Sequence, residues 1–297
     1  MPLNNVRGVI VKATGGFYYV HTSAGLLECR GRGLLRMERQ TPFVGDRVTV
    51  QQNDDGSGTV LEILPRKNEL KRPPLANLDY MVAVLSVTDP APNLQITDKF
   101  LAMLEYKGIE PLIAITKCDL EEPAPLAEIY TLAGYAVYTV DSTTGKGAKA
   151  LSRRLRGAFG AFSGNSGVGK SSLLNAICPD LDLAVGVTSK KLGRGKHTTR
   201  HVEIHPLPGG GYVADTPGFS SLSLVQLTRL PKEELADCFR EFRPFVGQCR
   251  YSDCAHTCEA GCGVLQAVQA GKIAPSRHLS YTQLYSELGE VKDWERR

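Results

Sequence analysis

The chain has 297 residues, of which 42% are hydrophobic and 22% charged, and a net charge of +4 at pH 7. This composition indicates an ordinary globular protein that is long enough for two or three domains. No apolar stretch approaches the roughly 20 residues that span a membrane. The N-terminus also lacks the basic start and apolar core of a secretory signal, so we expect a cytoplasmic protein with no membrane association.

The charge is unevenly distributed along the chain. Residues 1–72 hold 11 Lys and Arg against 7 Asp and Glu, whereas the remaining residues hold 24 of each. The excess therefore belongs to the N-terminal region. It indicates either a polyanionic partner or an ordinary solvated basic face.

The N-terminal region has a β-rich pattern. Short apolar segments separated by glycine and polar turns predict five strands, at 6–13, 16–22, 25–31, 46–52 and 58–64. Five short strands in about 65 residues favour a small β-barrel of the OB-fold type. We expect this domain to span residues 1–70, and a polar, proline-terminated linker at 65–74 to overlap its end.

A different pattern begins near residue 79 and continues to about residue 218. Continuous apolar strands alternate with helical segments, which predicts an α/β domain built on a parallel sheet with helices on both faces. The expected strands are 80–87, 111–116, 135–140, 159–164, 201–207 and 211–215, with helices near 94–108, 123–133, 147–156 and 171–177.

The strand at 111–116 ends in Thr116-Lys117-Cys118-Asp119, which resembles the base-reading loop of a GTPase. Asp119 can accept hydrogen bonds from both N–H groups of guanine, a pattern that adenine does not offer. Lys117 can lie over the base plane, and Thr116 replaces the more common asparagine at the cost of one amide contact. A second base loop is expected after the next strand and helix, at Ser142 and Thr143.

The sequence GNSGVGKS at 164–171 matches the phosphate-binding loop GxxxxGK[ST] at every fixed position. It follows an apolar strand and opens a helical segment, which is the context this motif requires. Backbone N–H groups of such a loop bind phosphates, Lys170 reaches the β- and γ-phosphates, and Ser171 binds Mg²⁺. The expected nucleotide contacts are Gly164, Asn165, Ser166, Gly167, Val168, Gly169, Lys170, Ser171 and Ser172.

Two further elements of a nucleotide switch follow this loop. The segment TSKKLGRGKHTTRHVE is rich in glycine and lysine and predicts a mobile loop, in which Thr198 or Thr199 supplies a second hydroxyl to Mg²⁺. Asp215, in DTPG at the end of a short strand, is expected to hold Mg²⁺ through water. Gly218 can offer its N–H to the γ-phosphate.

Phe219 stands where Ras-type enzymes place the glutamine that orients the attacking water. A phenyl ring cannot form a hydrogen bond to water, so we expect slow hydrolysis unless another group positions this water. His197 in the switch loop is the internal candidate, although a histidine in a loop can also be an ordinary surface residue.

The order of these parts is base loop, second base loop, phosphate loop, switch loop and DxxG, and no [NT]KxD motif follows Gly218. This order predicts a circularly permuted G domain, in which the segment after DTPG leads directly into the C-terminal region. The alternative is an ATP-dependent P-loop enzyme in which TKCD occurs by chance.

The C-terminal region, residues 226–297, predicts helices at 231–242 and 275–291 around a cluster of cysteines. The spacing Cys249-x4-Cys254-x-His256-x5-Cys262 offers three thiolates and one imidazole, which satisfy tetrahedral Zn²⁺ with no open position. We expect one structural Zn²⁺ in a small α-helical domain. Cys258 is a possible substitute ligand, and incidental cytosolic thiols are the alternative.

These motifs, in this order and over essentially the whole chain, resemble the RsgA family of circularly permuted, ribosome-dependent GTPases. The resemblance implies an OB-fold domain, a permuted G domain at 73–225 and a zinc-binding domain at 226–297. It implies GTP binding with Mg²⁺ and hydrolysis to GDP stimulated by the 30S ribosomal subunit, during late subunit maturation and with contacts to 16S rRNA. It places the catalytic group on His197, with Lys170 and Thr199 assisting, and we expect a monomer.

OB-folds commonly present a basic, aromatic face to nucleic acid. Six residues are candidates for such a face, although they could equally form barrel core and solvated rim: Phe17, Tyr18, Arg30, Arg32, Arg36 and Arg39. Phe219 also leaves open a regulatory module that binds GTP and RNA with negligible turnover.

Overall fold

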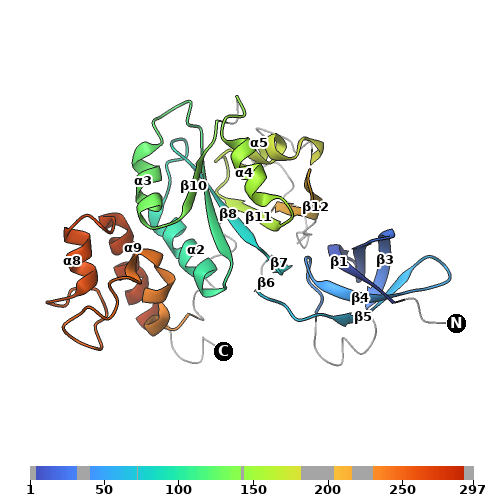
Figure 1. Ribbon diagram of the computed structural model, residues 1–297, viewed down its shortest axis with the longest axis horizontal. Coiled ribbons are helices and arrows are strands. Elements are labelled where there is room, and N and C mark those ends of the chain that lie inside the picture. Colours follow the sequence, from blue (N-terminus) through green and yellow to red (C-terminus); the bar gives the residue numbers. More distant parts are fainter. Residues whose placement is uncertain are drawn as a thin grey trace. The chain divides into compact units, whose positions relative to one another are not determined.

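The computed structural model describes residues 5–31, 41–71, 73–141, 144–181, 204–215 and 230–290 (Figure 1). The chain groups into two compact units: the first holds residues 1–80, 155–162 and 192–216, and the second holds the rest. No helix in the described ranges combines the length and the apolar character needed to cross a membrane.

Five strands of the first unit close into a barrel in the order β1-β2-β3-β5-β4. They are β1 (Asn5–Thr14), β2 (Phe17–Thr22), β3 (Gly25–Gly31), β4 (Arg47–Gln52) and β5 (Gly58–Ile63). Strands β3 and β5 pair in parallel, whereas the other neighbours pair antiparallel. The predicted five-stranded barrel is therefore confirmed.

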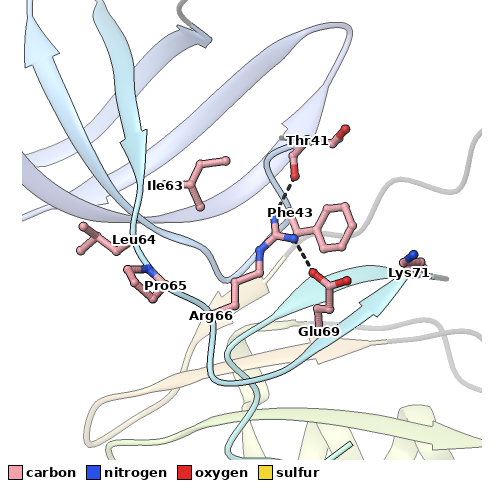
Figure 2. A pocket seen from close by; sticks show the side chains of 8 residues that line it. All are labelled: Thr41, Phe43, Ile63, Leu64, Pro65, Arg66, Glu69 and Lys71. Atoms are coloured by element: carbon pink, nitrogen blue, oxygen red, sulfur yellow. Dashed lines mark hydrogen bonds and ion pairs between the residues drawn. The ribbon is translucent and has the colours of Figure 1, made fainter. Parts of the chain in front are cut away.

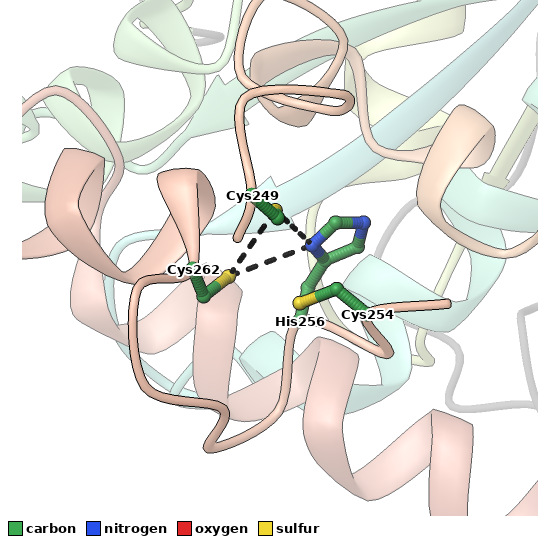
Figure 3. Close-up of side chains that lie close together, drawn as sticks. All are labelled: Cys249, Cys254, His256 and Cys262. Carbon is green, nitrogen blue, oxygen red and sulfur yellow. Dashed lines mark hydrogen bonds between the residues drawn. The ribbon is translucent and has the colours of Figure 1, made fainter. Parts of the chain in front are cut away.

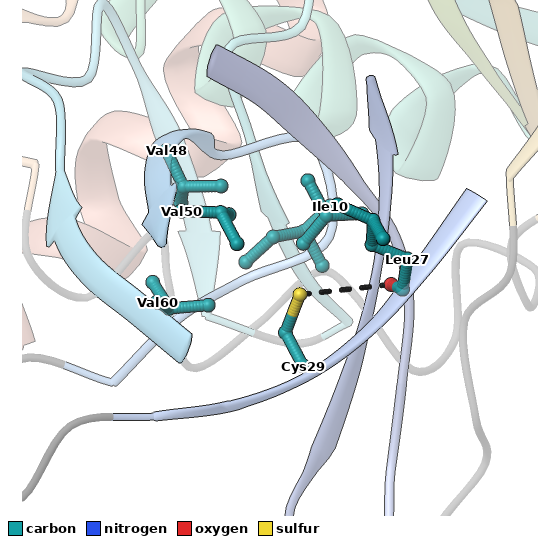
Figure 4. Close-up of a cluster of buried hydrophobic side chains, with 7 residues drawn as sticks. Ile10, Leu27, Cys29, Val48, Val50 and Val60 are labelled. Atoms are coloured by element: carbon teal, nitrogen blue, oxygen red, sulfur yellow. Dashed lines mark hydrogen bonds between the residues drawn. The ribbon is translucent and has the colours of Figure 1, made fainter. Parts of the chain in front are cut away.

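The barrel encloses a small apolar core (Figure 4). Val48 and Val50 of β4 are buried and Thr49 between them is partly exposed, which is the alternation expected of a strand with one buried face. The buried members of this core are Ile10, Val20, Leu27, Cys29, Val48, Val50 and Val60. Burial raises the pKa of the Cys29 thiol to about 11, so this cysteine is a neutral packing residue.

Residues 65–71 and 73–76 are more ordered than the predicted linker. They contain a two-stranded sheet of β6 (Glu69–Lys71) and β7 (Pro74–Ala76), with Leu70 and Leu75 fully buried. Arg66 fixes this segment: its guanidinium binds Asp46 at 2.7 Å and Glu69 at 2.6 Å, and it lies 4.1 Å from the centre of the Phe43 ring. Arg66, Glu69 and Phe43 are among the residues that line a cavity of about 580 Å³ (Figure 2). Strands of three residues are too short to show a periodic pattern, which is why the sequence indicated only a linker.

A six-stranded sheet has the order β10-β9-β8-β11-β13-β12. Its strands are β8 (Tyr80–Ser86), β9 (Glu110–Thr116), β10 (Ala136–Thr139), β11 (Phe159–Gly164), β12 (Ile204–Pro206) and β13 (Tyr212–Asp215). The pairs β9–β10 and β11–β13 are parallel, as predicted, but β12 runs antiparallel to β13. The prediction of a wholly parallel sheet is wrong at this edge, because the turn at 207–211 is short enough to join the two strands as a hairpin.

The predicted helices of the α/β region are present as α2 (Leu94–Tyr106), α3 (Ala124–Leu132), α4 (Ala148–Leu155) and α5 (Lys170–Ile177). Asn93 caps the N-terminus of helix α2: its side chain accepts a hydrogen bond from the Ile96 N–H at 3.1 Å. It buries Phe100, Leu101 and Leu104, which are spaced to lie on one face of the helix.

The C-terminal region contains α8 (Gly263–Gln269) and α9 (Pro275–Glu290), but the predicted helix over 231–242 is wrong. This segment forms three single 3₁₀ turns, η2 (Lys232–Glu234), η3 (Ala236–Cys238) and η4 (Arg240–Phe242). The regular helix breaks at Phe239, whose backbone is extended with φ −111° and ψ 100°. The Phe239 ring is fully buried, at 5.3 Å from the Tyr281 ring. The backbone conformation of this segment is thus set by the burial of its aromatic side chains and not by the helical spacing of its apolar residues.

A buried charged cluster joins helix α2 to this C-terminal region. Arg277 of α9 is fully buried and donates to Asp98 of α2 at 2.7 Å and to Glu241 of η4 at 2.6 Å. Removing one partner from such a cluster is costly, because the other charges remain buried without compensation. This cluster therefore fixes the C-terminal region to the α/β region within the second unit.

Candidate functional site

The phosphate loop begins where β11 ends at Gly164 and continues into α5, which begins at Lys170. Gly167 and Gly169 both have φ of +84°, a conformation that glycine adopts without strain. A Cβ on Gly164 would lie 2.6 Å from the Val84 carbonyl oxygen, so β8 and β11 approach too closely for any other residue. The predicted loop thus has the backbone of an anion-binding turn at a helix N-terminus.

The predicted base loop lies against this phosphate loop. Thr116 is fully buried at the end of β9, and its hydroxyl donates to the Val168 carbonyl at 2.5 Å, with the Leu85 carbonyl at 3.1 Å. Its hydroxyl therefore contacts backbone rather than solvent. A strand end and a loop 52 residues apart in the chain are thereby joined.

Lys117 and Asp119 extend from this contact. Lys117 has a left-handed backbone conformation, with φ of 59°, and its ammonium group donates to the Asp89 carbonyl. Asp119 is exposed to solvent and is free to meet a ligand. Positive φ values in residues other than glycine are uncommon and concentrate at functional sites, which adds to the significance of Lys117.

Sequence reasoning missed the loop after β8. Ser86 is fully buried and donates to the Pro90 carbonyl at 2.7 Å, and a Cβ on Gly167 would lie 3.7 Å from Cδ of Pro90. Together with the Lys117 contact to Asp89, these bonds place residues 89–90 beside both predicted loops. The turn-forming sequence Asp-Pro-Ala-Pro-Asn was the available signal.

The strand registers bring further predicted segments to the same edge of the sheet. Thr139 of β10 pairs with Ile115 of β9, and Asp215 of β13 pairs with Phe162 of β11. Ligands of open α/β sheets bind outside the carboxyl ends of the strands. The remaining predicted residues lie outside the described residues: Ser142, Thr143, His197, Thr198, Thr199, Gly218, Phe219 and the side chain of Asp215.

The predicted cysteine and histidine ligands come together in one cluster (Figure 3). The ligand atoms of Cys249, Cys254, His256 and Cys262 all lie within 4.8 Å of one another. His256 Nδ1 is 3.4 Å from the Cys249 sulfur and 3.5 Å from the Cys262 sulfur. Three thiols and one imidazole at this spacing are consistent with a zinc site. Cys258 is exposed and is not part of the cluster.

Hydrogen bonds from neighbouring residues hold the ligand loop in this shape. The Glu259 carboxylate accepts the backbone N–H groups of Ala255, Thr257 and Cys258 at 3.0, 2.9 and 3.1 Å. Burial alone would raise the pKa of Glu259, but these donors dominate and lower it to about 2. Tyr281 of α9 donates to the Ala255 carbonyl at 2.8 Å. The cluster is therefore supported by residues outside the ligand set.

The candidate nucleic-acid residues of the barrel divide into two groups. Tyr18 packs against the barrel core, whereas Arg30 is exposed and lies 4.8 Å from the centre of the Phe17 ring on the neighbouring strand. Arg32, Arg36 and Arg39 lie outside the described residues.

The fold and the loops define a class of protein: a P-loop nucleotide-binding protein whose base loop precedes its phosphate loop in the chain. Family models agree with this class. The model described as RsgA GTPase matches residues 63–225, and the model described as RsgA N-terminal domain matches residues 7–60.

Curated relatives match along nearly the whole chain. A small ribosomal subunit biogenesis GTPase RsgA from Alkaliphilus metalliredigens is 45% identical over 291 residues, which is 96% of this chain and 98% of the relative. The protein of that name from Caldanaerobacter subterraneus subsp. tengcongensis is 44% identical over 298 residues, which is 99% of each chain.

Solved structures also match. YjeQ from Thermotoga maritima superposes with a TM-score of 0.82 at 34% identity, covering 97% of this chain and 100% of that one. YloQ, described as a circularly permuted GTPase, superposes with a TM-score of 0.81 at 37% identity. This match covers 97% of this chain and 96% of the YloQ chain. The chain belongs to the RsgA family of small ribosomal subunit biogenesis GTPases. It is accordingly a circularly permuted GTP hydrolase, and the alternative of an ATP-dependent enzyme is wrong.

Proposed function

We propose that this chain binds the 30S ribosomal subunit through 16S rRNA and hydrolyses GTP to GDP and phosphate there, in support of late subunit maturation. The observation that carries this proposal is the bond between Thr116 and the Val168 carbonyl, which joins the base loop to the phosphate loop in the permuted order. The family relatives, named for small ribosomal subunit biogenesis, support the choice of partner.

The proposed site has three groups of residues. Thr116, Lys117 and Asp119, with Ser142 and Thr143, serve the guanine base. The phosphate loop from Gly164 to Ser172 holds the phosphates, with Lys170 on the β- and γ-phosphates. Ser171 supplies a hydroxyl at the start of α5, where Mg²⁺ bound with GTP prefers oxygen ligands. Thr198 or Thr199, Asp215 and Gly218 complete the switch, and His197 positions the attacking water.

Multiple-turnover hydrolysis of GTP tests the activity, measured alone and with isolated small ribosomal subunits. We expect slow turnover alone and a large stimulation by small subunits, with large subunits as the control. Absence of stimulation would instead support a regulatory module that binds GTP with negligible turnover, the reading favoured by Phe219.

Base specificity has its own test. Asp119→Asn should shift the preference from GTP toward xanthosine triphosphate, because the amide of asparagine offers a donor where the carboxylate offers only acceptors. Glu121→Gln, at an exposed position two residues further along, is the matched control and should leave the preference unchanged. An unchanged preference in Asp119→Asn would refute the assignment of this loop.

For the cluster, we propose one structural Zn²⁺ per chain, held by Cys249, Cys254, His256 and Cys262. The donor set supports this choice because it fills all four tetrahedral positions and leaves none for substrate. Metal analysis of purified protein should give close to one equivalent of zinc, which falls in Cys254→Ala and persists in Cys258→Ala. Loss of zinc in Cys258→Ala would instead assign Cys258 to the ligand set.

We further propose three domains at 1–70, 73–225 and 226–297 in a monomeric, cytoplasmic protein. The separate family models for residues 7–60 and 63–225 support a first boundary between them. Light scattering of the pure protein tests the oligomeric state. Limited proteolysis with mass spectrometry tests the boundaries.

A further inference from the structure

Helix α4, labelled in Figure 1, has one buried face and one strongly basic exposed face by the burial of its residues. Ala148, Leu151 and Leu155 are buried, at a spacing that aligns them along one side of the helix. Lys149 and Arg153 are exposed on the opposite side, and Lys146 is exposed in the turn that precedes the helix. Lys146, Lys149 and Arg153 form what is called here the basic strip.

The charge of this segment is not balanced locally. Residues 144–157 contain five Lys and Arg and no Asp or Glu. Lys149 and Arg153 are four residues apart, where two like charges destabilise a helix by about 0.2–0.5 kcal/mol. Neither of them makes an ion pair with any described residue. Arg153 benefits from the helix dipole in the last turn, but Lys149 and Lys146 gain nothing from it.

The chemistry of the strip favours a phosphate backbone as its partner. None of the exposed large hydrophobic side chains in the described chain lies in residues 144–157, so the strip lacks the apolar centre typical of a protein interface. Long, flexible cations without aromatic neighbours are typical of contacts to nucleic-acid phosphates, which position a protein without reading sequence. The Lys146 carbonyl accepts from the Asp141 N–H at 3.1 Å, so the strip adjoins the loop that follows β10.

We propose that the basic strip of α4 binds the sugar-phosphate backbone of RNA in the small ribosomal subunit. This inference rests on the proposed function and adds to it a contact surface on the α/β region, separate from the barrel. It predicts contacts that depend on charge and salt but not on RNA sequence.

The test compares two double variants of the full-length chain. Lys149→Gln with Arg153→Gln removes both charges, and Lys149→Arg with Arg153→Lys retains them as the matched control. Binding to isolated small subunits and to naked 16S rRNA is measured between about 50 and 200 mM salt. Each lost phosphate contact should reduce the slope of log affinity against log salt by about 0.7–0.9. The glutamine variant loses two such contacts, so the magnitude of its slope should fall by about 1.5. Its affinity near 100 mM salt should fall by about tenfold or more, while the exchange variant behaves as wild type.

Basal GTP hydrolysis should be the same in wild type and both variants, because neither residue belongs to the nucleotide site, and this verifies folding. An unchanged slope in the glutamine variant, with wild-type binding intact, would overturn the strip proposal alone. If the glutamine variant bound assembled subunits more weakly than wild type but bound naked rRNA equally well, the strip would contact an acidic protein surface. That result would also overturn the strip proposal. Failure of wild type itself to bind small subunits would overturn the proposed function together with this inference.

Discussion

Thr116 joins the predicted base loop to the predicted phosphate loop through a single hydroxyl group. The hydroxyl lies 2.5 Å from the Val168 carbonyl in a fully buried position, so no water can replace it. The small Thr116 side chain lets the base loop approach the glycines of the phosphate loop: a Cβ on Gly169 would lie 3.5 Å from the Thr116 hydroxyl oxygen. Threonine in place of the usual asparagine therefore keeps a link between the loops.

Thr116→Val should weaken guanine nucleotide binding. Valine retains the shape of threonine but leaves the Val168 carbonyl buried without a donor, at a cost of about 1–3 kcal/mol. Where this cost destabilises the nucleotide-bound state, it weakens binding. We expect the Kd for GDP, measured by fluorescence titration, to rise about tenfold for each 1.4 kcal/mol of that destabilisation. Thr116→Ser retains the hydroxyl and should bind nearly as wild type. Equal affinities in all three proteins would show that the bond does not support the site.

Glu259 stabilises the ligand loop in a way that depends on pH. Its folded-state pKa of about 2 lies below the ordinary value near 4.3, so ionised Glu259 contributes stability above about pH 5. This contribution is lost as pH falls through the range between those two values. Glu259→Gln should lower the free energy of unfolding by about 1–3 kcal/mol at pH 7. In urea denaturation, the difference between the two proteins should shrink toward pH 2, and a difference that does not vary with pH would contradict this role.

At the scale of elements, the sheet was predictable where strands are continuous and apolar. The segments at 80–87 and 111–116 correspond to β8 and β9, whose residues are almost all buried. The phosphate loop was predictable because its motif fixes both the preceding strand and the following helix.

Other elements were not predictable, for separate physical reasons. Residues 231–242 show helical spacing, but the burial of Phe239 and Phe242 draws the backbone into 3₁₀ turns. The contact between residues 89–90 and the phosphate loop depends on the packing of Pro90 over Gly167, which no local pattern encodes.

Two glycine-to-alanine changes should have opposite effects on stability. Gly164→Ala places a methyl group 2.6 Å from the Val84 carbonyl, so β8 and β11 must separate at the start of the phosphate loop. We expect a loss of about 1–3 kcal/mol of stability together with weaker GTP binding. Gly289→Ala in α9 meets nothing within 4 Å and should stabilise the chain by about 0.4–1 kcal/mol. Thermal unfolding with and without GDP measures both, and a neutral Gly164→Ala would contradict the close approach of the strands.

At the scale of the whole molecule, the buried cluster around Arg277 links the nucleotide region to the region of the Cys/His cluster. Asp98 lies on α2, which follows the loop at residues 89–90, and Tyr281 of α9 binds the ligand loop one turn beyond Arg277. A permuted chain in which DTPG leads into the C-terminal region gains a second, non-covalent connection at this point. The two regions should therefore unfold together.

Arg277→Met should lower the free energy of unfolding by about 3–5 kcal/mol, because Asp98 and Glu241 then remain buried without a positive charge. Adding Asp98→Asn and Glu241→Gln should recover part of this loss. Arg243→Met is the matched control: Arg243 pairs with Glu105 but its side chain is 50% exposed, so its loss should cost no more than about 1 kcal/mol.

Two probes of urea unfolding decide whether Arg277 couples the regions: circular dichroism for the helices, and zinc release to a coloured chelator for the cluster. In wild type the two transitions should coincide, as expected of a single cooperative unit. In Arg277→Met zinc release should move to lower urea than the main loss of helix, because α9 then loses its buried ion pair to Asp98 of α2. Separate transitions already in wild type would mean that the region of the Cys/His cluster folds independently, and that nucleotide state reaches it only along the chain after DTPG.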